Sequence, residues 1–388
     1  MKMPTSQNTT SAAIVRWYEK RTQEHRPHLG CSILGHACAR YIWMTWRWAK
    51  TPTFPGRVLR LFNTGLREET RLLEELRGIG ATVWPTDPAS GTQWRVKACA
   101  GHVGGSLDGV AQGLPEAPKT PAVLEFKTHS HKSYTDLIAK GVQGAKPQHY
   151  DQMNLYMGLI ELERALYMAV DKDTDDVYTE WVHFDKARFD QLILKAEALI
   201  EASEPPPRIS DDPAHWQCKF CNFHAVCHGE IAAEANCRTC AHATPEMDGD
   251  GRWSCALKEK DLTVDDQLAG CTMHLMIPAL VPYAEPVDGG NNWVQYKHKA
   301  NGREFVNGHG RQMGDMPMFT SQELQHCPAA LLDGIAEIKE VFVDAKVVKP
   351  SVLDIVSDDP DQIPIKPEPI KQRQGRRKIK AALEAFKP

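Results

Sequence analysis

The sequence predicts an α/β core in which a mixed sheet is flanked by helices. Three observations lead to this fold class. Residues 55–80 carry apolar side chains at helical spacing and end in glycines. Short segments rich in β-branched and aromatic residues follow between 81 and 128. A helix, a strand hairpin and another helix then alternate up to the three prolines at 205–207, where the helical pattern has to stop.

Local patterns place the helices before the sheet. Residues 9–26 form a polar helical pattern, and a second helix is expected to begin near Ser32, whose hydroxyl suits an N-cap. The apolar residues of the helix over 55–80 are spaced for one face. The apolar positions of that face are Leu59, Phe62, Leu66, Leu72, Leu73 and Leu76.

Strands are expected where β-branched and aromatic residues gather between turn signals. They cover 81–84, 93–100, 102–112 and 122–128, and the proline-rich 113–121 is the turn between the last two. The remaining elements are a helix over 147–162, a hairpin of 164–170 and 177–184, and a helix over 186–202. Helices therefore precede and follow the sheet.

Length and composition indicate a globular protein of two or three domains. The chain has 388 residues, 25% of them charged and 42% hydrophobic, and its net charge of -4 does not by itself indicate a nucleic-acid partner. We expect neither export nor a membrane span, and a cytoplasmic location, because the chain has no apolar leader and no apolar run of roughly eighteen residues. Composition divides it into 1–230, a cysteine-rich 231–283 and a C-terminal 284–388.

One strand, 122–128, carries two opposite charges. Side chains alternate between the faces of a strand, so Glu125 and Lys127 share one face while Phe126 takes the other. On its own, a Glu–x–Lys sequence is most often a solvated edge with a local ion pair. Asp108 changes this interpretation, because pairing of the strands over 102–112 and 122–128 would bring a second carboxylate beside Glu125.

Such a group of oxygens has a preferred ligand. Two carboxylates, the Phe126 carbonyl and water form a hard-oxygen site suited to Mg²⁺ or Mn²⁺. Lys127 could then hold the attacking water or neutralise charge on a scissile phosphate. The pattern predicts metal-dependent phosphodiester hydrolysis.

These residues resemble the PD-(D/E)XK nuclease superfamily, and more closely its RecB and lambda-exonuclease-like branch. There, a helix with a G-x-x-x-(E/H) element precedes the Asp strand, and Gly65 and Glu69 match it. A Q-x-x-x-Y helix follows the E-x-K strand, and Gln152 and Tyr156 match it on one helical face. The resemblance covers roughly residues 28–230 and implies a restriction-endonuclease-like core. It implies catalytic roles for Glu69, Asp108, Glu125, Lys127, Gln152 and Tyr156, with the metal held by Glu69, Asp108, Glu125 and Phe126.

Each match also has an ordinary structural interpretation. Glu68 stands beside Glu69 in a charge-rich run, so the register of the helix decides between them. Asp108 precedes a glycine, a pair that is common in simple turns. Gln152 and Tyr156 could be a satisfied helix face. The functional interpretation is preferred because all elements occur in the order that the resemblance requires.

The cysteines indicate metal ligation rather than disulfides. Seven of the eleven fall between 218 and 271, and no export signal accompanies them. The C-x₂-C-x₅-C set at 218–227 lacks a fourth ligand. In the iron–sulfur nucleases of the RecB-like branch an earlier cysteine supplies it, and Cys38, in a C-x-R element, resembles that residue more than Cys31 does. The resemblance implies a [4Fe–4S] cluster, with zinc as the alternative, on Cys38, Cys218, Cys221 and Cys227.

A second set combines a C-x₂-C pair with two separated thiols. This spacing suits a tetrahedral structural zinc ion that organises a loop-rich module too small to fold around its own core, and a second iron–sulfur cluster is the alternative. His274 could replace one thiol, and Cys99 and Cys327 are expected to be ordinary thiols. The second set is Cys237, Cys240, Cys255 and Cys271.

Two further features could contact nucleic acid. Tryptophans 43, 46 and 48 with Arg40 and Arg47 could stack on bases, although tryptophans at this spacing are more often core. The tail at 371–380 holds six basic residues and no acid. It is either a solvated end or a sequence-independent phosphate contact.

The sequence thus predicts a Mg²⁺- or Mn²⁺-dependent DNA exonuclease that acts on duplex or single-strand ends. The resemblance implies a role in phage recombination or replication in the host cytoplasm, with a recombinase, single-strand-binding protein or helicase supplied by another chain. The sequence has no GxxxxGK[ST] or GxGxxG motif, which argues against a motor in this chain. The alternatives are a catalytically idle DNA-binding accessory protein, a structure-specific endonuclease and a redox protein, and the last leaves the carboxylates unexplained.

Overall fold

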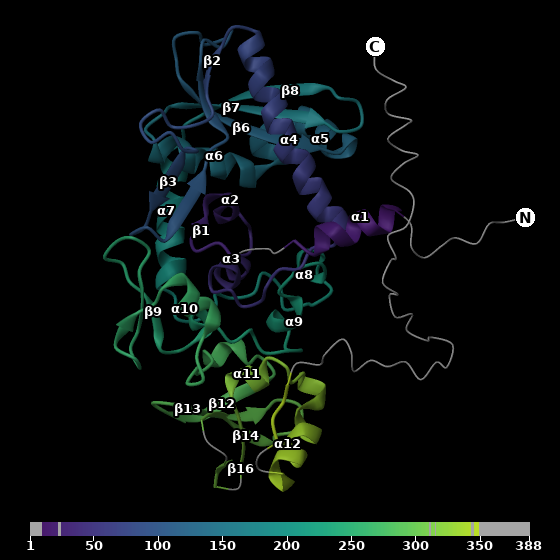
Figure 1. The fold of residues 1–388 in the computed structure, drawn as a ribbon, viewed down its shortest axis with the longest axis vertical. Helices are drawn as coiled ribbons and strands as arrows, with labels where there is room; N and C mark the ends of the chain where they lie inside the picture. Colours follow the sequence, from purple (N-terminus) through teal and green to yellow (C-terminus); the bar gives the residue numbers. More distant parts are fainter. Residues whose placement is uncertain (1–9, 22–24, 310–311, 315, 343–344, 349–388) are drawn as a thin grey trace, which may run out of the picture. The chain divides into compact units, whose positions relative to one another are not determined.

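Strand β6 (Ala122–His129), which carries the two opposite charges, is the middle strand of a five-stranded sheet (Figure 1). The strand order is β2-β5-β6-β7-β8, and β6 pairs antiparallel with β5 and parallel with β7. The sheet is therefore mixed, as the sequence predicts. Its other strands are β2 (Thr82–Trp84), β5 (Gly109–Gln112), β7 (Arg164–Asp171) and β8 (Val177–His183).

The computed structural model describes residues 10–21, 25–309, 312–314, 316–342 and 345–348, and those up to Val347 belong to one compact unit. The basic residues at 371–380 lie outside the described residues, so their contact with phosphate stays a prediction. Within the described ranges, no helix combines the length and the apolar character that crossing a membrane requires.

Helices cover both faces of the five-stranded sheet. On one face, Leu72 and Leu76 of α4 join a core cluster with Leu124 and Met168 of the strands. The opposite face, which includes Tyr167, packs against the two helices that follow β6, and the helix that follows β8 packs on the second of them. Sequence analysis missed the first of these, α5. The helices are α4 (Gly56–Gly78), α5 (His131–Ala145), α6 (Pro147–Leu159) and α7 (Lys186–Glu201).

The apolar face of α4 is buried only in its C-terminal half. Leu72 and Leu76 are 0% and 4% exposed, whereas Phe62 and Leu66 are 52% and 60% exposed. The spacing alone does not show which part of this face is buried. The sheet contacts the C-terminal half, while the N-terminal half runs past α1 (Thr10–Glu19) and away from the sheet (Figure 1).

The expected strand over 102–112 is in fact two strands in two sheets. Its first part, β4, pairs with β1 and β3, and its second part, β5, joins the main sheet. The chain leaves the first ladder at Leu107, whose N–H bonds the Trp94 carbonyl, and the side chain of Asp108 then accepts the N–H of Phe126 at 2.7 Å. The small sheet consists of β1 (Leu29–Gly30), β3 (Arg95–Ala98) and β4 (Val103–Ser106).

The second helix is also divided. The chain forms α2 (Cys31–Leu34) and then α3 (Ala39–Trp46), so the expectation of one helix capped by Ser32 is wrong. The N-cap of α3 is Cys38, whose sulfur accepts the N–H of Tyr41 at 3.4 Å. A predicted metal ligand therefore begins this helix.

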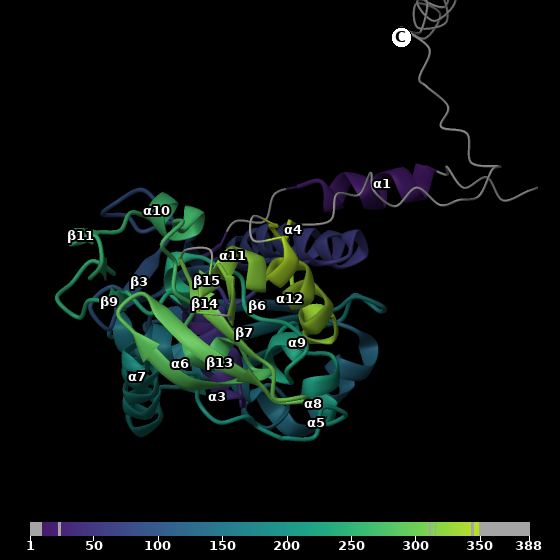
Figure 2. The same ribbon diagram turned by 90° about the horizontal axis from the view of Figure 1, so that it is seen from below.

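Short elements follow the proline run. Up to residue 280 these are α8 (Trp216–Lys219), α9 (His224–Cys227), η1 (Cys237–Thr239), β9 (Ala243–Pro245), β10 (Trp253–Cys255), β11 (Lys260–Asp261), α10 (Val264–Ala269) and η2 (Pro278–Leu280). A second five-stranded sheet then packs against α12, and Figure 2 shows its strands β13 and β14 side by side. These two strands form an antiparallel pair. The elements are β12 (Ala284–Gly290), β13 (Trp293–His298), β14 (Glu304–Gly308), β15 (Gln312–Met313), β16 (Met316–Phe319), α11 (Ser321–Leu324), η3 (Ala329–Leu331) and α12 (Leu332–Val341).

Candidate functional site

An acidic centre forms where β5 and β6 pair. Gly109 stands opposite Leu124, which brings Asp108 next to the start of the Glu–x–Lys motif. The Glu125 side chain is fully buried, and its carboxylate accepts a hydrogen bond from the ammonium of Lys127. Lys127 also donates to the Phe126 carbonyl at 3.1 Å. The carboxylates and the lysine thus share one face, as the alternation along the strand predicts.

Helix α4 adds a third carboxylate. Asp108 and Lys127 both affect the ionisation of Glu69, so the side chain of Glu69 faces the two strands. Glu68 points elsewhere and pairs with Arg71 at 2.8 Å. The register of α4 therefore selects Glu69. We call Glu69, Asp108, Glu125 and Lys127 the acidic centre.

Helix α6 fixes the buried carboxylate from the other side. Pro147 stands in its first turn, and the four-residue spacing places Gln152 and Tyr156 on one face. The Gln152 amide donates to Glu125 Oε2 and to the Tyr156 hydroxyl, each at 3.1 Å. Tyr156 donates in turn to the Ser106 carbonyl at 2.9 Å. This chain of hydrogen bonds holds the Glu125 carboxylate in one orientation.

The electrostatics of the acidic centre favour an added cation. Burial raises the pKa of Glu69 to about 7, and the Asp108 carboxylate adds to this shift while Lys127 opposes it. Burial also raises the pKa of Glu125 to about 7 and raises that of Asp108, in both cases against Lys127. Burial would lower the pKa of Lys127, but Glu125 and Asp108 outweigh it, and the net shift is upward. One ammonium thus compensates three carboxylates only in part.

A buried histidine network next to the acidic centre escaped the sequence analysis. Tyr167 lies beside Glu125 in the parallel ladder, and its hydroxyl bonds His129 at 3.0 Å and His149 at 2.9 Å. Burial, followed by nearby lysines, lowers the pKa of His129 to about 4 and that of His149 to about 3. Both rings are therefore neutral near pH 7. His129 could have been found from the sequence, because it lies four residues after Glu125 and therefore on the same face of the strand. Tyr167 could not, because the sequence does not show which residue of β7 lies beside Glu125.

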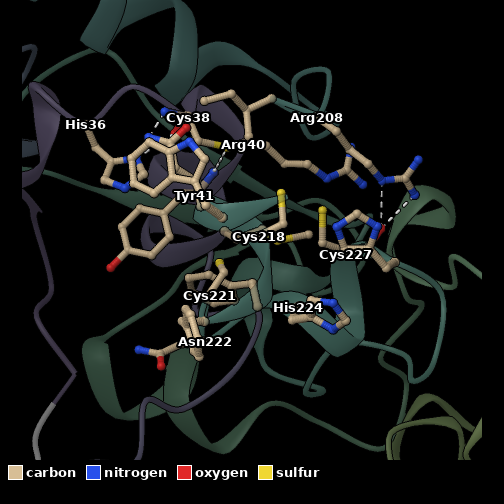
Figure 3. A pocket seen from close by; sticks show the side chains of 17 residues that line it. His36, Cys38, Arg40, Tyr41, Arg208, Cys218, Cys221, Asn222, His224 and Cys227 are labelled. Atoms are coloured by element: carbon tan, nitrogen blue, oxygen red, sulfur yellow. Dashed lines mark hydrogen bonds between the residues drawn. The ribbon is translucent and has the colours of Figure 1, made fainter. Parts of the chain in front are cut away.

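Four cysteines line one pocket of about 430 Å³. Figure 3 shows the four cysteine side chains near one another in the pocket, with Arg40 and Arg208 beside them. Burial raises the pKa of Cys218 and of Cys221, and the other thiols of the pocket add to both shifts. The first cysteine set is Cys38, Cys218, Cys221 and Cys227. Cys31 lies elsewhere, beside Cys99.

Hydrogen bonds prepare this pocket for thiolates. Backbone amides reach the sulfurs of Cys38, from Tyr41, and of Cys221, from Phe223. The Arg40 guanidinium bonds the Cys227 thiol. Arg208, which the sequence analysis did not single out, donates twice to the Cys227 carbonyl, at 2.8 and 2.6 Å (Figure 3). Four sulfurs with amide and guanidinium donors fit a thiolate-bound metal or cluster.

The second cysteine set, Cys237, Cys240, Cys255 and Cys271, also comes together. Burial raises the pKa of Cys237 to about 12, and the other three thiols add to the shift. His274 bonds the Asn236 carbonyl at 2.8 Å through Nε2, while its buried Nδ1 has no hydrogen-bond partner. Among all residues that the structure describes, however, no group of three or more His, Cys, Asp or Glu side chains is arranged so that it could hold a metal ion. Side chains at all three sites would have to rotate on binding.

The tryptophans before α4 belong to the core. Trp43, Trp46 and Trp48 are 0%, 1% and 3% exposed. The interpretation that these rings stack on bases is therefore wrong, because a nucleobase cannot reach them. The alternative, that they belong to the core, is confirmed. Arg47 is also buried, with its guanidinium 5.3 Å from the Trp43 ring.

No family model and no curated protein matches the chain. Among solved structures, that of SSO0001 is similar with a TM-score of 0.34 and 14% identity, over 57% of this chain and 97% of that one. The structure of the alkaline exonuclease LHK-Exo of Laribacter hongkongensis in complex with dAMP is similar with a TM-score of 0.33 and 13% identity, over 47% of this chain and 89% of that one. The structure of a phage-related exonuclease of Haemophilus somnus is similar with a TM-score of 0.30 and 15% identity, over 45% of this chain and 92% of that one. Similarity at these TM-scores carries no argument about this chain's function.

Proposed function

We propose that the chain is a metal-dependent DNA nuclease, and that it acts as an exonuclease on DNA ends. The acidic centre is the observation that carries this proposal. A lysine that neutralises a single buried glutamate would serve the fold alone, but three carboxylates around one lysine leave negative charge that burial makes costly. A divalent cation bound by oxygens relieves that cost.

The residues present fit such an ion. Asp108, Glu125 and the Phe126 carbonyl would hold it, with Glu69 approaching from α4. A bound Mg²⁺ or Mn²⁺ would supply Lewis-acid stabilisation of charge on the phosphate. Lys127 is 26% exposed at its side chain and can orient a water molecule or neutralise a phosphate oxygen. Gln152 and Tyr156 position Glu125 without touching the substrate.

The first cysteine set supports a [4Fe–4S] cluster, with zinc as the alternative. Such a group would join the start of α3 to α8 and α9, since its four ligands come from these two regions. Its role would be structural. Protein purified without oxygen is expected to be brown and to absorb broadly near roughly 400 nm. Colourless protein with zinc and no iron would establish the alternative while leaving the nuclease proposal unaffected.

A nuclease assay tests the proposed function. The full-length chain is incubated with linear DNA labelled at the 5′ or the 3′ end, with Mg²⁺, Mn²⁺ or EDTA. We expect release of mononucleotides or short fragments from ends, dependent on the metal ion and lost in Asp108→Asn. Glu68→Gln is the matched control, since Glu68 lies outside the acidic centre and should retain full activity.

The same assay separates the alternatives. Internal cuts in circular or branched DNA would indicate a structure-specific endonuclease. Binding of DNA without cleavage, unchanged by Asp108→Asn, would indicate an idle accessory protein and overturn the proposal. A role in phage recombination or replication with a partner recombinase or helicase rests only on the resemblance.

A further inference from the structure

The segment that holds the second cysteine set has little core of its own. Its strands β9, β10 and β11 are two or three residues long. Trp253 of β10 is 0% exposed because it packs against Trp46 of α3, with the ring centroids 5.3 Å apart. A segment of this kind needs another source of order.

One residue between Cys237 and Cys240 is buried in the core of the first 230 residues. Arg238, inside the C-x₂-C turn, is 1% exposed. Its guanidinium carbon lies 3.7, 4.5 and 4.9 Å from the ring centroids of Trp48, Trp46 and Trp253. We call these three rings the tryptophan cage.

The hydrogen bonds of Arg238 join three parts of the chain. It donates to the Trp46 carbonyl at 3.1 Å, to the Pro27 carbonyl at 2.7 Å and to the Gln267 side chain at 2.8 Å. All three acceptors are neutral, and burial lowers the pKa of Arg238 well below its usual value. A buried guanidinium without a carboxylate among these partners is costly, so the turn that carries it has to be held firmly.

The thiol groups surround this turn. Cys237 and Cys240 lie at its two ends, Cys255 ends β10, and Cys271 follows α10. The backbone amides of His242 and Leu275 donate to the Cys240 sulfur, as amides do around thiolates that bind metal. Lys260 lies close to Cys237 and Cys255, where it would offset the negative charge of a tetrathiolate site.

We propose that Cys237, Cys240, Cys255 and Cys271 bind one zinc ion, and that this ion holds Arg238 in the tryptophan cage. Four thiolates in a tetrahedral arrangement are a preferred ligand set for zinc, and no open position is left for catalysis. Binding requires the thiols to turn toward one point. The inference does not depend on the proposed nuclease function, because the two sites share no residue.

Metal analysis of the full-length chain tests the ligand set. The wild type is expected to carry about one zinc ion per chain at this site. The variants Cys255→Ser and Cys271→Ser are expected to lack this ion. Cys99→Ser and Cys327→Ser are the controls, and both should retain it. Iron and the absorbance near roughly 400 nm should still be present in all five proteins. Loss of iron instead of zinc in the two ligand variants, or unchanged zinc, would overturn the assignment.

A second measurement uses the wild type alone, in case the ligand variants do not fold. An organic mercurial reagent is titrated into the protein, and the zinc released is followed with a chelating dye together with tryptophan fluorescence. Release should be accompanied by a red shift of the emission, because the tryptophan cage opens to water. The shift should be smaller in Trp253→Phe. Stoichiometric release without any spectral change would refute the link between the ion and Arg238, and absence of released zinc would refute the site.

Discussion

The acidic centre draws its residues from α4, from β6 and from the position just before β5, all parts of the main sheet and its long helix. Both cysteine sets instead stand on or beside short helices, on the three-residue strand β10 and in loops. In the acidic centre, Gln152 donates to the Glu125 carboxylate, and Asp108 accepts the N–H of Phe126. The cysteine sulfurs accept hydrogen bonds from backbone amides as well, but no strand of the main sheet carries them. The paired strands and the long helix thus bring the carboxylates together, whereas the proposed metals would order the loops that carry the thiols.

The largest expected effect concerns activity without stability. Lys127→Met removes the ammonium from the acidic centre but keeps the length of the side chain. Cleavage should fall by roughly two to four orders of magnitude, since the charge that stabilises the reacting phosphate or water is lost. With Mg²⁺ bound the melting temperature should change little, because the cation then compensates the buried carboxylates. Lys132→Ala, at the exposed start of α5, is the control, and an equal loss there would show that the effect is not specific to the acidic centre.

For the first cysteine set, the main expected effect of a substitution is on stability rather than on activity. Cys38→Ser retains a side chain that can cap α3 but removes a ligand, so the visible absorbance should be lost and the free energy of unfolding should fall by several kcal/mol. Cys31→Ser, at a buried thiol outside the set, should keep its absorbance. Denaturant unfolding monitored by circular dichroism gives the stability. A Cys38→Ser protein with unchanged iron and stability would remove the distinction between the two kinds of site.

A smaller effect follows from the raised carboxyl pKa values. Glu69 and Glu125 have a pKa of about 7 in the fold against 4.5 normally, so between these pH values the folded chain binds more protons than the unfolded one. The stability of metal-free protein should therefore fall, by roughly 1–3 kcal/mol, as the pH rises from 4.5 to 7. Added Mg²⁺ should restore it above pH 7. The Glu69→Gln, Glu125→Gln double variant should show a flatter profile in EDTA, and an unchanged slope would mean that these carboxyls do not govern it.

Local sequence patterns were sufficient to predict those parts of the fold that residues close in sequence determine. The alternation around Phe126 and the four-residue spacing of Gln152 and Tyr156 both place side chains on a common face, and the hairpin of β7 and β8 follows from two apolar runs. The adjacency of Asp108 and Glu125 needed only one correct strand pairing.

Long-range contacts account for what was missed. Nothing local distinguishes Arg238 from an exposed arginine, because its tryptophan cage comes from residues about 190 positions earlier and from β10. The exposure of Phe62 and Leu66 depends on where the sheet ends beneath α4, and the break at Asp108 depends on an N–H that β6 provides. Propensity and periodicity carry no information about such partners.

Helix α3 is only eight residues long, yet both cysteine sets act on it. The thiol of Cys38 caps its first turn, and Arg238, from the second set, bonds the carbonyl of Trp46 at its last residue. If both sites are filled as proposed, each cofactor favours the helix geometry that the other requires, and by linkage each raises the affinity of the other by the same factor. Maturation of the protein would then be cooperative, and a cell short of iron would produce chains that also lose zinc more readily.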